Sequence, residues 1–421
     1  MLRSRFSWGA RHVAFLCALI WTMVLPVRAQ SVYSLDELLI FAESANPSLA
    51  VARGQQGAAR AALDSASAYP NPELELSSGR YQARIEGVRG GAVEGATLSQ
   101  AIELPTLRGE RQRAATSGLE GADAALEAVS IGLRAQVRQA YFEVLRRNEE
   151  SAIAEESRQL LEQIRNRVKV KVEVGEAPRY ELIKAEAELL NAASAGAAAR
   201  LRVDEAKAVL RALSGGKLPW SFELAKGVPN LAPTPALEQL RQGMLASHPS
   251  LRQARAETAR AQARVAQERA LGVPQPTLRA GYERDPETRQ WRVGVSLPLP
   301  VWNQRQGPIG EAVGALHQAE ALERQQELML TQELEGAHAR LQIALRQQEA
   351  VVGGLMKEAQ AALLVAEAAY RFGERGILDY LDAQRTLRAV RSDAIQSRYN
   401  LLSAAIEIKR LSGTELLGVK P

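Results

Sequence analysis

Asp379 and Asp382 carry two carboxylates three positions apart within the stretch AYRFGERGILDYLDAQRTL, which begins at residue 369. Residues three apart lie on one face of a helix, so this pair could act as an acid and a base, or could attract cations. Acidic residues at this spacing more often form an ordinary solvated helix face. The pair alone therefore does not indicate an enzyme.

Other residues that could support catalysis or metal binding are scarce. Three histidines follow the first 29 residues, and none of them is spaced as a metal or catalytic pair: His248, His317 and His338. The sequence has neither a glycine-rich phosphate loop nor a Gly-x-Ser-x-Gly elbow. We expect no catalytic residue, no cofactor, no metal site and no enzymatic activity.

Residues 1–29 have the features of a secretory signal peptide. Arginines at the start precede an apolar run over residues 13–27, and Ala29 supplies the small residue before a cut at Gln30. An uncleaved anchor is the alternative, but the apolar run is shorter than the ~20 residues of a spanning helix. The single cysteine, Cys17, lies inside this run and lacks the preceding small residues of a lipid-attachment site. The exported chain then has no thiol for disulfides, thiolate metal sites or nucleophilic catalysis.

The exported part of the chain is close to neutral. The whole chain has a formal charge of +5, but four arginines and no acidic residue fall within the first 29 residues. The remainder carries 49 basic against 48 acidic side chains. Nucleic-acid binding needs cationic charge concentrated on one face, so we expect no nucleic-acid partner.

The chain contains an internal repeat. GEAPRYELIKAEAELLNAASAGAAARLRVDEAKAVLRALSG from Gly175 aligns without a gap, 198 residues earlier, with GERGILDYLDAQRTLRAVRSDAIQSRYNLLSAAIEIKRLSG from Gly373. Both copies open with Gly-Glu and close with Leu-Ser-Gly, and proline-containing motifs earlier in each copy match in the same order. The predicted organisation is a signal peptide at 1–29, a first repeat at 30–216, a linker at 217–234, a second repeat at 235–413 and a C-terminal tail at 414–421.

Most of each repeat is predicted to be helical. Ser34 with Glu37 forms a capping box, and Asn46 before a proline recaps the chain into a second helix. Later in the two copies, residues 109–174 and 309–372 contain no proline, and apolar residues recur there every three or four positions. At 1.5 Å per residue, each segment would form a helix of roughly 100 Å. We interpret the apolar stripe as packing between helices.

Between the helices, apolar and polar residues alternate. TLRAGYERD from Thr277 and QWRVGVSLP from Gln290 place apolar residues on one face and charged or small residues on the other. The first repeat shows the pattern more weakly around Leu74 and Leu98. Strands of ~10 residues with this alternation are typical of a transmembrane β-barrel, although a soluble half-buried hairpin gives the same pattern. Four strands cannot close a barrel in lipid, so several chains would have to contribute to one barrel.

Further motifs extend over nearly the whole exported chain: SANPSLAVARGQ, AYPNPELELSSG, SQAIELPTLRGERQRAA, VSLPLPVWNQRQGPIGEA and the two Gly-Glu turns. With the tandem repeat, they resemble the TolC family of outer-membrane efflux channels, and within it the heavy-metal, CzcC-like branch. The resemblance implies a mainly α fold with a small β part. Three chains would share one twelve-stranded barrel in outer-membrane lipid, and their coiled-coil helices would form a tunnel in the periplasm.

The same resemblance implies partners. A homotrimer of this kind docks through a periplasmic adaptor (membrane fusion) protein onto an inner-membrane RND-type pump that is driven by the proton gradient. The chain would then be the passive exit duct of a tripartite efflux system. In the CzcC-like branch the exported substrate would be heavy-metal cations.

The resemblance also implies a gate at the periplasmic tip. In the family, a Tyr and an Arg near the inner helix turn link to an acidic residue on the neighbouring helix pair, and a ring of aspartates narrows the entrance. The matching residues here are Tyr370, Arg375, Asp379, Asp382 and, as the acidic partner, Glu181. The tip turns, where paired helices reverse, would contain Gly175, Gly373 and Gly376. A link from Arg375 to Glu181 is expected in the closed state.

Other functions remain open on the sequence alone. A multidrug or other small-molecule channel would have the same fold, and the exported chain shows no soft-metal relay, since it has no cysteine and only three scattered methionines. A periplasmic adaptor also has a helical hairpin, but it needs flanking β-rich domains. A structural coiled-coil protein would not explain the alternating strands.

Overall fold

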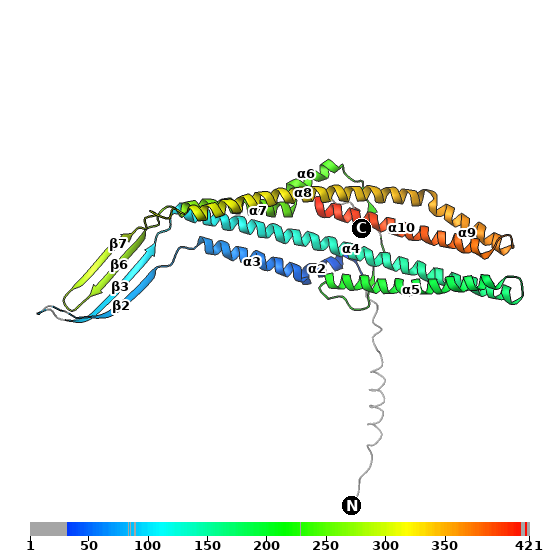
Figure 1. The fold of residues 1–421 in the computed structure, drawn as a ribbon, viewed down its shortest axis with the longest axis horizontal. Coiled ribbons are helices and arrows are strands. Elements are labelled where there is room, and N and C mark those ends of the chain that lie inside the picture. Colours follow the sequence, from blue (N-terminus) through cyan, green and yellow to red (C-terminus); the bar gives the residue numbers. More distant parts are fainter. Residues whose placement is uncertain are drawn as a thin grey trace, which may run out of the picture.

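The computed structural model of the chain describes residues 32–82, 84, 86–87, 90–227, 229–413 and 417–418. The molecule is elongated, with a β-sheet at one end and two helical turns at the other, joined by long helices (Figure 1). The predicted signal peptide at 1–29 lies outside the described residues, as does most of the predicted tail at 414–421. Among the described residues, no helix has both the length and the apolar composition that crossing a bilayer requires.

The two halves of the chain have the same order of elements, which confirms the predicted mainly helical fold with an internal repeat. The first half contains α2 (Leu35–Ala45), α3 (Pro47–Ser67), β2 (Glu73–Tyr81), β3 (Gly91–Ala101), α4 (Pro105–Glu173) and α5 (Arg179–Leu213). The second half contains α6 (Leu237–Ser247), α7 (Pro249–Ala270), β6 (Thr277–Arg284), β7 (Arg289–Ser296), α8 (Gln306–Ala350), α9 (Met356–Arg371) and α10 (Ile377–Ser412).

Side-chain caps explain where α2, α3 and α7 begin. Ser34 Oγ accepts a hydrogen bond from Glu37 N (3.3 Å), and a Glu37 carboxylate oxygen accepts one from Ser34 N (2.8 Å), which is the predicted capping box. Asn46 caps α3, since its Oδ1 accepts a hydrogen bond from Ser48 N at 2.9 Å. His248 caps α7 in the matching place of the second half. The corner between the two helices is therefore built in the same way twice.

The four strands form one antiparallel sheet in the order β2, β3, β6, β7. One row across this sheet is apolar, with Leu74, Leu98, Ala280 and Val293 in register. The next row, whose side chains point to the other face, contains Glu75, Thr97, Gly281 and Arg292. The predicted alternation is thus present on all four strands. Within this sheet, the edge strands β2 and β7 are each paired on one side.

The second long helix is interrupted, and the prediction of a continuous helix over residues 309–372 is wrong. A π-helical turn, Val351–Leu355, separates α8 from α9. Gly354 has φ = 154°, a backbone conformation that residues with a Cβ rarely adopt. The Gly353-Gly354 pair therefore interrupts the helix without any proline. The corresponding helix of the first half, α4, is assigned as a single helix of 69 residues.

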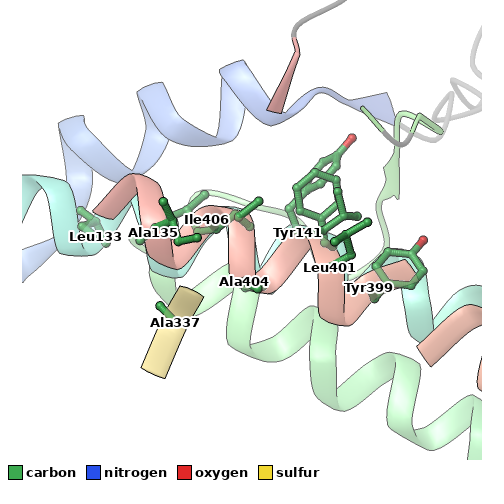
Figure 2. Packing of buried hydrophobic residues seen from close by; sticks show 14 of the residues in the cluster. Leu133, Ala135, Tyr141, Ala337, Tyr399, Leu401, Ala404 and Ile406 are labelled. Carbon is green, nitrogen blue, oxygen red and sulfur yellow. The ribbon is translucent and has the colours of Figure 1, made fainter. Parts of the chain in front are cut away.

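The largest apolar cluster lies near the middle of the molecule, where helices of both halves meet (Figure 2). Tyr141 of α4, Ala337 of α8 and Leu401 of α10 are all buried in it. Tyr141 also donates a hydrogen bond from its Oη to the carbonyl oxygen of Ala225 at 2.6 Å. Because one cluster contains residues of both repeats, the two halves pack as one body.

The segment predicted as a linker, residues 217–234, is itself part of this packed region. Leu218 and Phe222 are buried in the central cluster. Two small strand pairs lie alongside: β1 (Val32–Tyr33) parallel to β4 (Glu223–Leu224), and β5 (Asn230–Leu231) antiparallel to β8 (Leu417–Gly418). The connection between the repeats is therefore folded rather than extended.

Candidate functional site

Two helix reversals form the end of the molecule opposite the sheet (Figure 1). Each contains the same two backbone hydrogen bonds. Between α4 and α5, Gly175 N donates to Val172 O (3.1 Å) and Glu176 N donates to Lys171 O (2.8 Å). Between α9 and α10, Gly373 N donates to Tyr370 O (3.3 Å) and Glu374 N donates to Ala369 O (2.9 Å). Both pairs of bonds define a Schellman motif. Residues related by the 198-residue offset therefore occupy equivalent places in the two turns.

The three glycines of these turns are not equivalent. Gly175 has φ = 80° and Gly373 has φ = 74°, so both lie in the left-handed region that a Schellman motif requires. Gly376 has φ = −74° and ψ = 166°, an extended conformation open to any residue, and it is the residue before α10. No heavy atom lies within 4 Å of a Cβ placed on Gly376. The backbone therefore requires glycine at the first two positions and not at the third.

A separate apolar cluster packs the two hairpins against each other beside the turns. Its buried members come from α4, α5, α9 and α10: Leu161, Ile164, Val168, Ala185, Ala192, Tyr370, Ile377, Tyr380 and Leu381. Ile377, the first residue of α10, is among the most deeply buried side chains of the chain. Burial of one such side chain stabilises the fold by about 1.5–3 kcal/mol. The turns are therefore supported by a core of their own.

Tyr370 belongs to this cluster and is 9% exposed. Its ring stacks on that of Tyr380, with ring centroids 6.0 Å apart and planes 9° apart, and Lys171 Nζ lies 4.5 Å from the ring centroid. Among the described residues, the buried Tyr370 Oη has no hydrogen-bond partner. Burial, and secondarily the negative charge of Glu181, raises the pKa of Tyr370. The hydroxyl group is therefore a protonated donor close to an acidic residue of the other hairpin.

Arg375 forms an ion pair within its own hairpin. Its Nη1 lies 3.2 Å from Asp379 Oδ2, and both side chains are at least half exposed. Within the described part of the chain, this pair replaces the link from Arg375 to Glu181 that the resemblance implies. Exposed ion pairs of this kind contribute only about 0.2–1 kcal/mol. Replacing Asp379 by Glu181 as the partner of Arg375 would therefore cost little free energy.

Asp382 lies about one turn beyond Asp379 on the same face of α10, and both side chains are exposed. The Asp382 carbonyl oxygen accepts a hydrogen bond from Thr386 Oγ1 at 3.0 Å. Glu181, at the start of α5, is partly buried. The structure thus gathers all five predicted gate residues at one end of the chain and leaves the two aspartates facing solvent.

Ion pairs between the hairpins were not predicted from the sequence. Arginines of α10 bind glutamates of the first hairpin in three places: Arg385 with Glu188 of α5, Arg391 with Glu156 of α4 (3.1 Å), and Arg398 with Glu149 of α4. Arg391 and Arg398 are seven residues apart, a spacing that returns to the same face of a helix. Arg385, six residues before Arg391, lies about 120° away around the helix, and its partner belongs to α5 rather than α4. The seven-residue spacing was a signal for the two pairs with α4.

The described residues contain no group of three or more His, Cys, Asp or Glu side chains that could hold a metal ion. His248 is buried, and its Nδ1 accepts the helix-capping hydrogen bond from Ser250 N at 3.2 Å. His317 Nδ1 lies 3.4 Å from Glu320 Oε2 on the surface. His248 therefore serves as a helix cap and His317 lies beside a single carboxylate, and neither arrangement is a metal site.

The sequence of this chain is similar to those of known proteins. The family described as Outer membrane efflux protein matches residues 39–216 and 240–414, one segment in each repeat. The cobalt-zinc-cadmium resistance protein CzcC of Cupriavidus metallidurans is 28% identical over 394 residues, covering 93% of this chain and 92% of CzcC. The pyoverdine export outer membrane protein OpmQ of Pseudomonas aeruginosa is 26% identical over 393 residues, covering 86% of this chain and 81% of OpmQ.

A solved structure shares the fold at lower sequence identity. The crystal structure of CusC, described in connection with transmembrane channel formation, superposes with a TM-score of 0.79 and covers 89% of this chain and 91% of its own. Its sequence is 21% identical, so this likeness shows the fold alone.

Proposed function

The chain belongs to the outer membrane efflux protein family, and from that premise we propose that it is the exit duct of a tripartite efflux system for heavy-metal cations. The sheet lies in the outer membrane, and the helical part extends into the periplasm. A proton-driven RND-type pump in the inner membrane would deliver the substrate, and a periplasmic adaptor would join the pump to the duct. The duct itself is passive and performs no catalysis.

The sheet edges support assembly as a trimer. β2 and β7 are paired on one side only within the described sheet. An unpaired backbone group in hydrocarbon costs several kcal/mol, so a strand edge cannot remain open there. Joining β7 of one chain to β2 of the next, three times, closes a barrel of twelve strands with no free edge.

Similarity to CzcC is the observation that carries the choice of metal cations. It extends over almost the full length of both chains. The similarity to OpmQ, whose name states export of pyoverdine, favours export of a small organic molecule as a second candidate. The exposed carboxylates of Asp379 and Asp382 agree better with a cationic substrate, because they attract positive charge at the entrance of the duct.

We place the gate of this duct at the helical turns. In a trimer, three copies of Asp379 and Asp382 around one axis would attract cations and repel one another. Tyr370 and Arg375 supply hydrogen-bond donors, and Glu181 supplies the acidic acceptor that would hold adjacent hairpins together. Each exposed link contributes about 0–1 kcal/mol, so a closed gate needs several links repeated by symmetry. Binding of an adaptor that competes for these groups would then be sufficient to open it.

Metal tolerance tests the substrate. The chain is expressed with a heavy-metal RND-type pump and its periplasmic adaptor in a host that lacks its own metal efflux, and growth is measured with Co²⁺, Zn²⁺ or Cd²⁺ and with organic toxicants. We expect metal tolerance that requires all three proteins. Tolerance to organic compounds alone would contradict the metal assignment and support the second candidate.

Assembly is tested separately on the purified protein. We expect a trimer in mild detergent that dissociates on heating and conducts ions across a planar bilayer. A monodisperse monomer that still conducts would contradict the shared barrel.

A further inference from the structure

Arg284 of β6 and Arg289 of β7 lie directly opposite each other, as the last paired residues before the turn that joins the two strands. Their side chains share the face of Tyr282 and Trp291, because residues two apart on a strand point the same way. Both arginines are exposed. Like charges directly opposite in an antiparallel pair destabilise a sheet. Pairing within the sheet therefore does not account for this arginine pair.

The carboxylates nearest to the arginine pair in sequence have other partners. Asp285 closes the turn, since its Oδ1 accepts hydrogen bonds from two backbone N–H groups of the turn at 2.8 Å and 2.6 Å. Glu283 points to the opposite face of the sheet, where its Oε2 lies 3.4 Å from Arg292 Nη2. Within the described part of the chain, neither member of the arginine pair forms an ion pair.

The rest of the same row does not balance the charge. Glu94 of β3 lies opposite Arg284, and Ser78 of β2 lies opposite Glu94. Glu94 is exposed, and among the described residues no ion pair joins it to Arg284. The row across the four strands thus contains two basic side chains and one acidic side chain. It keeps a positive charge on the face that is apolar elsewhere.

This row lies at the end of the sheet away from the helices (Figure 1). Because the helical part extends into the periplasm, that end is extracellular. The preceding row contains Tyr282 and Trp291, whose ring centroids are 4.8 Å apart. A basic residue on the lipid-facing side of a barrel is unfavourable at the middle of the bilayer and tolerated near its surface. The arginine pair is therefore placed at the level of the outer-leaflet headgroups.

Two adjacent guanidinium groups suit phosphate more than other anionic groups. Each guanidinium presents a fixed fork of N–H donors that can bind two phosphate oxygens at once. The outer leaflet of an outer membrane is formed by a glycolipid whose sugar headgroup carries phosphates. With such a phosphate at the arginine pair, the acyl chains of the lipid would follow the exposed apolar side chains of Trp291, Val293 and Val295 toward the helices.

A neighbouring chain would add a third arginine to this rim. Arg80 follows Ser78 on the same face of β2, and it is exposed. In the proposed barrel, β7 of one chain joins β2 of the next. Arg80 of the next chain would then lie on the same outer rim as Arg289, which increases the positive charge at each boundary between chains.

We propose that Arg284 and Arg289 bind the phosphate groups of the glycolipid in the outer leaflet of the outer membrane. The inference rests on the proposed function, since it requires the sheet to lie in the outer membrane. It assigns an anionic lipid as ligand to two charges that the passage of substrate through the duct does not use.

Native mass spectrometry of the purified trimer tests the inference. Trimers in mild detergent are titrated with lipid A that carries both phosphates, with the same lipid after removal of its phosphates, and with inorganic phosphate. The variant R284Q/R289Q removes both charges of the arginine pair. The matched control is R279Q/R292Q, because these two arginines belong to the same strands but point to the opposite face.

We expect the unmodified trimer and the control to bind phosphorylated lipid A, and R284Q/R289Q to bind it about tenfold or more weakly, because hydrogen bonds between charged groups are lost. Equal binding of phosphorylated and dephosphorylated lipid by the unmodified trimer would overturn the inference, even where the variant does not assemble. Equal binding of phosphorylated lipid by R284Q/R289Q and the control would also overturn it. Displacement of the lipid by an equal concentration of inorganic phosphate would show a site for free phosphate instead.

Conductance separates a failure of this inference from a failure of the proposed function. The arginine pair lies outside the lumen, so R284Q/R289Q should conduct ions across a planar bilayer like the unmodified trimer. A trimer that conducts but has no preference for phosphorylated lipid contradicts the lipid site alone. A chain that forms no conducting trimer contradicts the exit duct itself.

Discussion

Arg375 Nη1 lies 3.2 Å from Asp379 Oδ2, so an ion pair between two groups of the proposed gate joins the turn before α10 to the first turn of that helix. The buried hydroxyl of Tyr370 belongs to the preceding helix of the same hairpin. Because an exposed pair of this kind contributes at most about 1 kcal/mol, substitutions here should change the opening of the gate without unfolding the packed turns.

Removing the donors of the proposed gate should raise conductance. The double variant Tyr370→Phe with Arg375→Ala removes the hydroxyl and the guanidinium but keeps the buried ring. We expect a higher single-channel conductance in planar bilayers, since fewer links would hold the hairpins together. Tyr380→Phe with Arg371→Ala, the same residue types in the same hairpin, is the control. Equal conductance of both double variants and the unmodified trimer would refute the role of these donors.

Removing the two aspartates should weaken block by multivalent cations. Asp379→Ala with Asp382→Ala takes two negative charges per chain from the exposed face of α10, so a trivalent cation added from the periplasmic side should block at higher concentration. Glu176→Ala with Glu374→Ala removes the same charge from equivalent positions of the two turns and serves as the control. If the aspartate variant forms an intact trimer and is blocked at the same cation concentration as the unmodified protein, Asp379 and Asp382 do not form a ring at the entrance.

The two glycines of the inner turn should respond differently to alanine. Gly373 has a positive φ, so Gly373→Ala should cost roughly 1–2 kcal/mol in the turn. Gly376 is extended and unobstructed, so Gly376→Ala should be close to neutral. Amide hydrogen exchange of the turn measures the difference, with faster exchange expected only in Gly373→Ala. Equal protection in the two variants would contradict the turn geometry.

His248 should make stability depend on pH. Burial and, second, the Arg410 cation lower the pKa of His248 below 6.5, against the opposing charges of Glu333 and Glu127. The native state thus prefers the neutral ring, so its contribution to stability is complete above pH 6.5 and is lost as the pH falls through the lowered pKa. A protonated Nδ1 also could not accept the hydrogen bond from Ser250 N.

The matched variant is His248→Asn, because Asn46 caps the equivalent helix of the first repeat. Denaturant unfolding between about pH 7.5 and about pH 5.5 should show a smaller loss of stability in this variant than in the unmodified chain. An identical loss in both proteins would show that other groups cause the pH dependence.

The sequence was sufficient for features that depend on local chemistry. The capping box at Ser34, the alternation that aligns Ala280 with Val293, and the Gly-Glu turns each follow from backbone or side-chain preferences of a few neighbouring residues. The strand alternation and the Gly-Glu turns occur in both halves of the chain, so one half supports the interpretation of the other.

Features that depend on distant contacts were not predictable in this way. The ion pair of Arg391 with Glu156 depends on how the hairpins pack, and sequence spacing alone does not determine it. The expectation of a continuous helix over residues 309–372 rests on the absence of proline and on the apolar periodicity, and it overlooks that the two consecutive glycines at 353 and 354 also destabilise a helix. The packed state of Phe222 likewise depends on a core built from both repeats.

The break at Gly353-Gly354 gives the two hairpins different mechanics. Its counterparts at the 198-residue offset are Glu155 and Glu156, and Glu155 pairs with Arg200 of α5 at 2.7 Å, which links the two helices of the hairpin formed by α4 and α5. The hairpin of α9 and α10 has a helix break at the place where the hairpin of α4 and α5 has this ion pair. From that break, the 16 residues of α9 form a lever of ~24 Å. With such a lever arm, a rotation of ~5° displaces the far end of α9, and with it Tyr370, by ~2 Å. The two copies of the repeat therefore differ at this place, since one has an ion pair between its helices and the other has a glycine break that could act as a hinge.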